Sequence, residues 1–280
     1  MNIIKMNKKF KIMLIIISAI IIIFAYYCYI FEPNNLQIKE AEIKLKNLPE
    51  QFRGVRIIHL TDFHSKKFGR REKKVLKMVS QLNPDFVFIT GDFVDRTTKN
   101  IRNCKEFWKL LAQRYQNRVY GVLGNHEYSN SNHYYLKRAL SESGIAILNN
   151  ENKKLFFKDE FINLIGVDDP RTSRDDLAKA MAGADNELPK ILLAHSPDIL
   201  NRIDDYKIDL ILCGHTHGGQ IRIPFIRPFW TPTKFKGKYA KGLFKVKSSY
   251  LYVNPGVGVT FFPIRINCPP EITLIKLEKQ

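Results

Sequence analysis

The sequence predicts an α/β domain in which two packed β-sheets are flanked by helices, preceded by one N-terminal transmembrane helix. Three observations predict this fold. Residues 12–31 form an uncharged apolar run, strand-like runs alternate with amphipathic helical patterns up to Gly144, and short strand-like segments separated by turn residues follow. The alternation is typical of βαβ units in a largely parallel sheet, whereas short strands with turns between them favour hairpins.

The apolar run at residues 12–31 is long enough to cross a bilayer. Its twenty residues would span about 30 Å as a helix, the thickness of the hydrocarbon core. Four lysines precede it without an acidic residue, so the positive-inside rule predicts that a basic tail, residues 1–11, is cytoplasmic and that the domain is extracytoplasmic. A cleaved signal peptide is the alternative, but its apolar region is typically roughly 7–15 residues long and ends at small residues. We therefore predict an uncleaved, single-pass anchor in the cell membrane.

The remaining chain divides into a polar linker, residues 32–51, with room for one edge strand, and a domain, residues 52–280. Val75, Met78, Val79 and Leu82 recur at helical spacing and predict a helix between two buried strands. The predicted strands are 55–62, 85–92, 118–127, 145–148, 153–157, 161–166, 190–195, 209–215, 250–256 and 271–277, and further helices are predicted at 102–115 and 174–182.

The chain is strongly basic, with a formal net charge of +18. Four lysines lie in the first 31 residues, so the rest still carries +14. Such a charge suits nucleic acid, anionic lipid head groups or phosphorylated substrates, although lysines spread along the chain equally suit a solvated surface. The four cysteines form no CxxC pair, which excludes a thioredoxin-like or zinc-finger pattern, and Cys104 and Cys268 are left either free or paired.

Metal-binding residue types stand at the ends of five predicted strands. They are Asp62 and His64, Asp92, Asn125, His195, and His215 and His217. The carboxyl ends of strands in an open α/β sheet converge on one crevice, so we expect these side chains to meet. Oxygen and imidazole donors without a thiolate suit Mn, Fe, Zn or Mg. Each residue alone has a structural explanation, such as a helix N-cap for Asp92, but their joint occurrence predicts a metal site.

The same segments, in this order over residues 55–217, resemble the motif set of the calcineurin-like metallophosphoesterases. Residues 214–224, 254–260 and 269–275 also resemble the family's membrane-associated bacterial phosphodiesterase branch, which includes enzymes that cleave the pyrophosphate of UDP-2,3-diacylglucosamine. The resemblance implies a metallophosphatase-like four-layer sandwich and two divalent metal ions, with Mn, Zn or Fe expected. It further implies one cation on Asp62, His64 and His217, a second on Asn125, His195 and His215, and Asp92 bridging both.

The resemblance also implies two catalytic residues. His126 would protonate the leaving oxygen, which suits an imidazole whose unperturbed pKa is about 6.5. Asp95 would orient His126, or else only cap a turn. The aromatic and basic segment 225–245 is broken by prolines, and we interpret it either as an ordinary surface loop or as a loop that touches the membrane or an acyl chain.

We therefore predict a dinuclear-metal-dependent phosphoester hydrolase, a phosphodiesterase or pyrophosphatase, acting at the membrane. Its expected partners are membrane lipid and a phosphoester substrate, either lipid-linked or a nucleotide sugar, and no specific nucleic acid is expected. A membrane-tethered nuclease is the first alternative, supported by the basic charge. A non-catalytic metal-binding scaffold is the second, although the presence of all seven ligands together with His126 disfavours it. The sequence does not indicate an oligomeric state.

Overall fold

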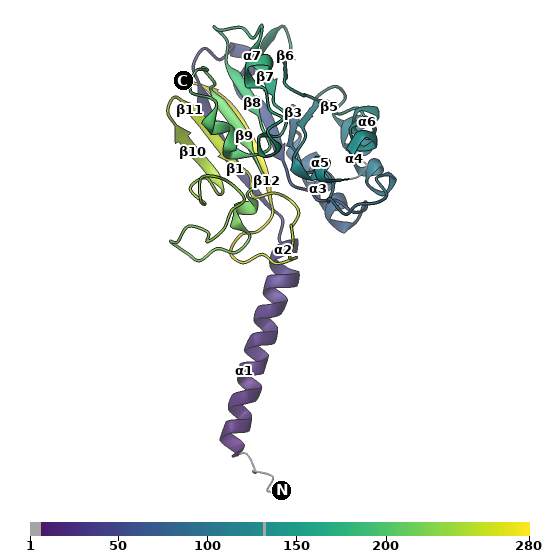
Figure 1. Ribbon diagram of the computed structural model, residues 1–280, viewed down its shortest axis with the longest axis vertical. Coiled ribbons are helices and arrows are strands. Elements are labelled where there is room, and N and C mark those ends of the chain that lie inside the picture. The colour runs from purple at the N-terminus through teal and green to yellow at the C-terminus, as the bar shows by residue number, and fades with distance from the viewer. Residues whose placement is uncertain (1–6, 131–132) are drawn as a thin grey trace.

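One long helix leads into a domain built on two sheets (Figure 1). The computed structural model describes residues 7–130 and 133–280, so part of the basic tail predicted for residues 1–11 lies outside the described residues. Helix α1 (Lys8–Tyr26) continues through a π-helical turn (Tyr27–Phe31) into α2 (Glu32–Asn34). By length and composition alone, the helix from Lys8 to Asn34 is able to cross a membrane.

The first sheet has six strands in the order β1-β12-β2-β3-β4-β5. They are β1 (Gln37–Leu45), β12 (Glu271–Lys279), β2 (Arg56–Leu60), β3 (Phe86–Thr90), β4 (Val119–Val122) and β5 (Ala146–Ile147). Only β12 and β2 run antiparallel to one another; the other neighbours are parallel. Segment 32–51, which the sequence predicted as a linker with room for an edge strand, contributes β1 at the edge of this sheet.

The second sheet also has six strands, in the order β10-β11-β9-β8-β7-β6. They are β10 (Gly242–Val246), β11 (Ser249–Val253), β9 (Leu210–Cys213), β8 (Lys190–Leu193), β7 (Glu160–Gly166) and β6 (Glu151–Phe157). The β6–β7 and β10–β11 pairs are antiparallel hairpins and the inner strands are parallel. Residues 145–148 were grouped with the hairpin strands from the sequence, but β5 instead extends the first sheet, parallel to β4.

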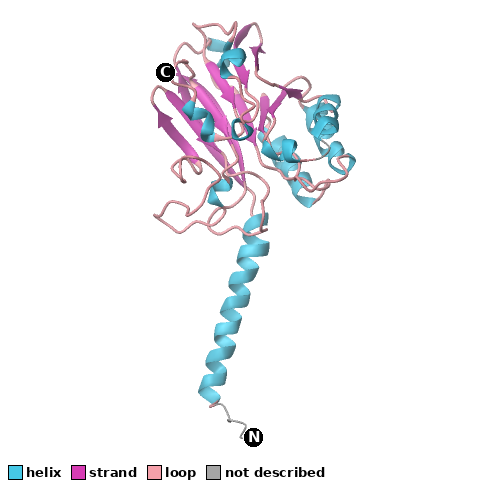
Figure 2. Cartoon of the chain, viewed as in Figure 1, coloured by secondary structure: helices cyan, strands magenta, loops and turns pink. Residues whose placement is uncertain are grey.

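Three apolar layers hold the domain together. The core between the sheets contains Phe52, Phe88 and Leu212 from both sides of the sandwich. A second cluster fills the space between the first sheet and the helices α3 (Arg70–Leu82), α4 (Arg102–Arg114) and α6 (His133–Glu142), and a third includes α7 (Leu177–Met181) against the second sheet. Figure 2 shows the helices outside the strands. Every residue of β3 is buried, because the strand is covered on both faces.

The four cysteines all lie within the described residues and are free, buried thiols. Cys104 contacts the carbonyl oxygen of Ser65, and Cys268 contacts that of His217. The pairing of Cys104 with Cys268 that the sequence left open therefore does not form.

Candidate metal centre

The seven predicted ligands lie together where β2, β3, β4, β8 and β9 end. Three of these strands belong to the first sheet and two to the second, so the site forms where the two sheets meet. The side chains of Asp62, His64, Asp92, His195, His215 and His217 are all buried, and Asn125 is half-buried at the start of the short helix α5 (Asn125–Ser129). The sequence-based expectation that distant strand ends converge is thus met in space.

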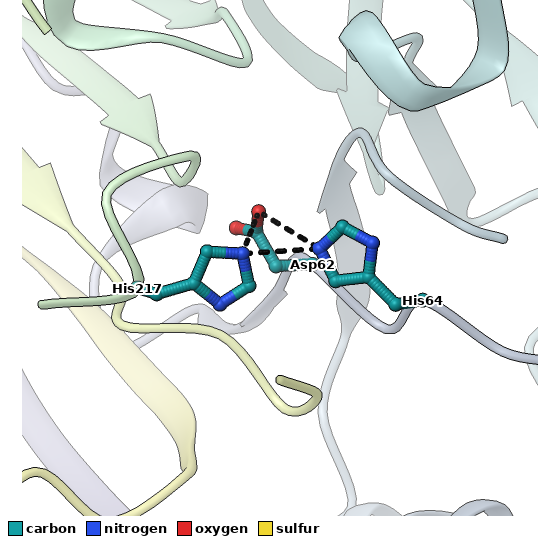
Figure 3. A group of neighbouring side chains, drawn as sticks. All are labelled: Asp62, His64 and His217. Atoms are coloured by element: carbon teal, nitrogen blue, oxygen red, sulfur yellow. Dashed lines mark hydrogen bonds and ion pairs between the residues drawn. The ribbon is translucent and has the colours of Figure 1, made fainter. Parts of the chain in front are cut away.

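Asp62, His64 and His217 form the first of two groups, shown in Figure 3. The Nε2 atoms of His64 and His217 are 3.0 Å apart, and Oδ1 of Asp62 lies 3.2 Å from Nε2 of His217 and 3.8 Å from Nε2 of His64. The other carboxylate oxygen, Oδ2, accepts hydrogen bonds from the Thr61 hydroxyl and the His215 backbone N–H, each at 2.8 Å. Oδ1 is therefore left facing the two imidazoles.

Asn125, His195 and His215 form the second group. Nε2 of His195 lies 3.1 Å from Nδ1 of His215 and 3.2 Å from Oδ1 of Asn125. The opposite ring nitrogens face carbonyl oxygens, at 2.7 Å for Nδ1 of His195 and Thr90 and at 3.0 Å for Nε2 of His215 and Pro232. Because a carbonyl only accepts, each of these outer nitrogens carries the proton, and the lone pair of the inner nitrogen points into the group.

Asp92 lies between the two groups. Its Oδ1 accepts a hydrogen bond from the His126 backbone N–H at 2.9 Å. Its Oδ2 lies 3.4 Å from Nε2 of His195 and 3.5 Å from Nε2 of His64. One carboxylate oxygen is thus placed almost equally close to an imidazole of each group.

The donor atoms in both groups fit divalent cations. Two ligands at a right angle around a cation, each about 2.1 Å away, are about 3.0 Å apart. The inner donor pairs match this spacing, at 3.0 Å for His64 and His217 and at 3.1 Å for His195 and His215. The first group and the cluster of Asp92, His195 and His215 each have the arrangement of a possible metal site.

The buried charges shift one another's pKa values. Burial alone would raise the pKa of Asp92, but His195 and His64 outweigh burial and keep it below its usual value. Burial and the neighbouring His195 lower the pKa of His215 to about 3. Burial and the negative charge of Asp92 raise the pKa of Glu127 to about 8, although Glu127 accepts backbone hydrogen bonds from Asp92 and Gly124. The carboxylate between the groups is therefore ionised, and a neutral His215 is available as a ligand.

His126 and Asp95 lie close together at the mouth of the site. Nδ1 of His126 accepts a hydrogen bond from the Arg96 backbone N–H at 3.3 Å, which leaves the ring proton on Nε2, 4.0 Å from Oδ2 of Asp92. Asp95 belongs to the same cluster of donor groups, but its Oδ1 accepts from the backbone and hydroxyl of Thr97. A hydrogen bond from the Arg96 backbone thus orients His126 in the described structure.

A cleft of about 160 Å³ opens over the two groups. Its lining includes Asp92, Asn125, His126, His215 and His217. Three further lining residues, Arg171, Trp230 and Phe261, were not assigned to the site from the sequence. Trp230 lay in the aromatic segment noted there, and Phe261 directly follows residues 254–260, which carry part of the family resemblance. Arg171 follows no motif, so only the folded chain identifies it.

Gly218 and Gly219, which follow the last predicted ligand, serve the packing of the turn. Gly218 has a φ of +62°, and a Cβ there would lie 2.5 Å from Sγ of Cys268. A Cβ on Gly219 would lie 2.3 Å from Cβ of Pro228. These glycines therefore permit close contact between chain segments behind the cleft.

Known proteins resemble the chain over most of its length. The sequence profile described as calcineurin-like phosphoesterase matches residues 55–219. An uncharacterized metallophosphoesterase of Bacillus subtilis, YkuE, is 31% identical over 90% of this chain and 89% of its own length. A zebrafish (Danio rerio) transmembrane protein with a metallophosphoesterase domain is 32% identical over 95% of this chain and 62% of its own length. The phosphodiesterase YaeI of Escherichia coli is 27% identical over 79% of this chain and 82% of its own length.

A solved structure supports the fold. The protein TT1561 of Thermus thermophilus superposes with a TM-score of 0.50 over 73% of this chain and 90% of its own. Only 12% of the aligned residues are identical, so the similarity concerns the arrangement of sheets and helices.

Proposed function

The chain belongs to the calcineurin-like phosphoesterase family, and from this premise we propose that it hydrolyses a phosphodiester or a pyrophosphate with two divalent cations. One observation carries the proposal. Oδ2 of Asp92 lies 3.4 Å from an imidazole of one donor group and 3.5 Å from an imidazole of the other. A carboxylate shared in this way is what keeps two cations close enough to act on one phosphoryl group.

Each of the two donor groups would bind one cation. One cation would be held by Asp62, His64 and His217. The other would be held by Asn125, His195 and His215, and Asp92 would bind both cations. When bound, such a pair of cations polarises the phosphoryl group and supplies a hydroxide near neutral pH. The protein contributes the fixed geometry, because the backbone carbonyls of Thr90 and Pro232 orient two of the ligands before any cation arrives.

His126 is the proposed proton donor. Its Nε2–H points toward Asp92 because Nδ1 is occupied by the Arg96 N–H. Once a second proton binds Nδ1, the ring is an imidazolium; as the bond between phosphorus and the leaving oxygen breaks, it would pass its Nε2 proton to that oxygen and become neutral, which is general acid catalysis. Burial lowers the pKa of His126 more than Asp92 raises it, so in the cation-free protein the imidazolium form is a stronger acid than an unperturbed imidazolium. Asp95 would assist by keeping the turn around Arg96 in place.

We further place this reaction at a membrane, with the chain anchored by a single span and its domain outside the cytoplasm. The apolar helix from Lys8 to Asn34 and the relatives named as transmembrane proteins in zebrafish and cattle support the anchor. The name of YaeI supports a diester substrate. The substrate class expected from these observations is a lipid-linked or nucleotide-sugar phosphoester, with Mn, Zn or Fe as the cations.

The test uses the full chain in detergent, stripped with a chelator and supplied with Mn²⁺ or Zn²⁺. A phosphate monoester, a phosphodiester and a nucleotide pyrophosphate are compared, and bound metal is measured by elemental analysis. We expect metal-restored hydrolysis that falls at least about 10³-fold in Asp92→Asn, since this change weakens both cation sites. Asp159→Asn, on the exposed turn between β6 and β7, is the matched control. Equal turnover in the two variants would refute the dinuclear mechanism.

Two other outcomes would favour the alternatives. Salt-sensitive digestion of single-stranded DNA, with no action on small esters, would favour the nuclease that the basic charge suggests. Binding of two cations without turnover on any phosphoester would favour a metal-binding scaffold.

A further inference from the structure

Two loops beside the cleft expose large apolar side chains to water. One joins β9 to β10 and the other joins β11 to β12. Their exposed residues, which we call the apolar face, are Ile223, Phe225, Ile226, Phe229, Phe261 and Phe262. The amide of the Gln220 side chain joins the loops by donating to the carbonyl oxygen of Thr260 at 3.1 Å and accepting from its N–H at 2.8 Å. Large apolar side chains exposed together on two joined loops are typical of an interaction site.

The two loops that carry the apolar face lie at the end of the domain from which the N-terminal helix leaves (Figure 1). The backbone N–H of Arg265 donates to the carbonyl oxygen of Cys28 at 3.1 Å, and that of Cys268 donates to Oε1 of Glu32 at 2.9 Å. The neighbouring Ile266 accepts a hydrogen bond from the backbone N–H of Arg222. The β11–β12 loop is thus bonded to the end of the helix, and the β9–β10 loop is bonded to the β11–β12 loop. A bilayer crossed by this helix would therefore lie beside the apolar face.

The charge of this region matches an anionic lipid surface. No acidic residue occurs between Asp209 and Glu271. The two loops contain the basic residues Arg222, Arg227, Lys234, Lys236, Lys238 and Lys241, all at least partly exposed. Exposed aromatic rings among lysines and arginines are typical of protein segments that lie in the head-group layer, where the rings insert and the cations meet lipid phosphates.

The apolar face continues into the cleft. The rings of Trp230 and Phe261 are 6.2 Å apart, and both residues line the cleft that contains Asp92 and His126. The Arg96 guanidinium lies over the Phe261 ring, 5.3 Å from its centre. The cleft, at about 160 Å³, is smaller than the roughly 300–1,000 Å³ of pockets that enclose a drug-sized ligand. It therefore receives a phosphoryl group while the rest of the substrate extends over the aromatic rim.

We propose that the apolar face docks on the bilayer crossed by the protein's own N-terminal helix and turns the mouth of the cleft toward the head groups. The substrate is then a membrane amphiphile that keeps its apolar chains in the bilayer while its phosphoester is hydrolysed. This inference rests on the proposed function for the reaction, but docking itself can be measured without turnover.

The first experiment measures docking through Trp230. The chain has two tryptophans, and Trp108 belongs to α4 and is buried in the core between α4 and the first sheet. The full chain is reconstituted in vesicles of phosphatidylcholine and phosphatidylglycerol in equal parts, with or without bromine in the upper acyl chains. We expect brominated lipid to quench the emission of Trp230 at least about twofold, because docking places indole at the head-group boundary. Trp230→Phe should lose the quenched component, and equal Trp230 emission in both vesicles would overturn the proposal.

The second experiment compares substrates. The triple variant Phe225→Ser, Phe229→Ser, Phe262→Ser removes exposed rings of the apolar face, whereas Tyr134→Ser, Tyr135→Ser, Phe156→Ser removes three exposed rings elsewhere, from α6 and β6. We expect the first variant to cleave an amphiphilic phosphodiester in vesicles about tenfold more slowly while hydrolysis of a soluble ester is unchanged. Equal rates on vesicles for both variants would overturn docking, as would self-association through this face in detergent, which would assign it to a second copy of the chain.

The two experiments separate this inference from the proposed function. If no ester is hydrolysed by any form of the protein, the proposed function fails, and Trp230 quenching still decides whether the face docks. If soluble esters are hydrolysed but Trp230 is not quenched, only the docking inference fails.

Discussion

The two donor groups of the site are held in different ways. In the second group, His195 and His215 each donate their outer ring proton to a backbone carbonyl. In the first group, Nδ1 of His64 and Nδ1 of His217 find no hydrogen-bond partner among the described residues. The first group instead has its own carboxylate, Asp62, whereas the second has the neutral amide of Asn125 in addition to the shared Asp92.

This difference indicates two physical routes to a bound cation. Negative charge in a buried site attracts a cation strongly, even where no hydrogen bond fixes the outer nitrogen of the imidazoles. Hydrogen bonds that fix an imidazole's tautomer and direction strengthen binding without added charge, typically by about 10–100-fold in affinity. We therefore expect cation binding by the first group to depend mainly on the charge of Asp62. Cation binding by the second group should depend mainly on the hydrogen bonds that orient its imidazoles.

The largest effect is expected from removing the charge of the first group. Asp62→Asn keeps the shape of the side chain but leaves that group with only the shared charge of Asp92. We expect elemental analysis to show loss of one of two cations, and hydrolysis to fall at least about 10³-fold. Retention of both cations with near-normal turnover would contradict a charge-dependent first group.

Removal of the proposed proton donor, His126, should slow catalysis but leave the affinity of both donor groups for cations unchanged. His126 contacts the first group through His64, with ring centres 4.4 Å apart, and lies 4.0 Å from Asp92. His126→Gln is expected to lower kcat about 10²-fold or more, as is typical for loss of a general acid. Metal content should equal that of the unmodified protein, and a lower content would instead make His126 a ligand.

A change behind His195 tests the geometry of the second group. Gly91 has a φ of +88°, and a Cβ at this position would lie 2.6 Å from Nδ1 of His195. Gly91→Ala therefore displaces His195 from the Thr90 carbonyl, and we expect one cation to bind about 10–100-fold more weakly, by chelator competition. Gly183→Ala, at a φ of +75° with open space around it, is the matched control for backbone strain. Equal affinities in both variants would remove the distinction between the groups.

The smallest effect concerns Glu127, which supports the bridge and the second group by accepting N–H bonds from Asp92 and Gly124. Burial and the charge of Asp92 raise its pKa from the ordinary 4.5 to about 8 in the folded chain. The folded state therefore holds a proton that the unfolded state releases, so this group's stabilisation is complete below pH 4.5 and is lost as pH rises toward 8.

Glu127→Gln removes this titration. In metal-free protein, the free energy of unfolding should fall less between pH 5 and pH 8 in the variant than in the unmodified chain, by urea titration. Glu151→Gln, at an exposed residue of β6, should keep the pH dependence of the unmodified chain's free energy of unfolding. An unchanged slope in Glu127→Gln would show that Glu127 is already ionised in the folded state.

The sequence by itself predicted the fold class and the residues that meet at the site. Apolar runs such as 85–92 identify buried strands locally, and each run ends in the donor it delivers, so His64 and Asp92 could be named before any contact was known. The family resemblance then supplied the order of the motifs and the expectation of two cations. These features are local, because a strand and the residue after it are adjacent in the chain.

Tertiary structure alone decided how those residues are held. The protons of His195 and His215 are fixed by carbonyls at Thr90 and Pro232, the first of them 105 residues away in the chain. The placement of β5 in the first sheet and the position of the apolar face beside the helix depend likewise on pairings between distant segments. No local pattern encodes such contacts, because they form only when packing of both sheets brings the segments together.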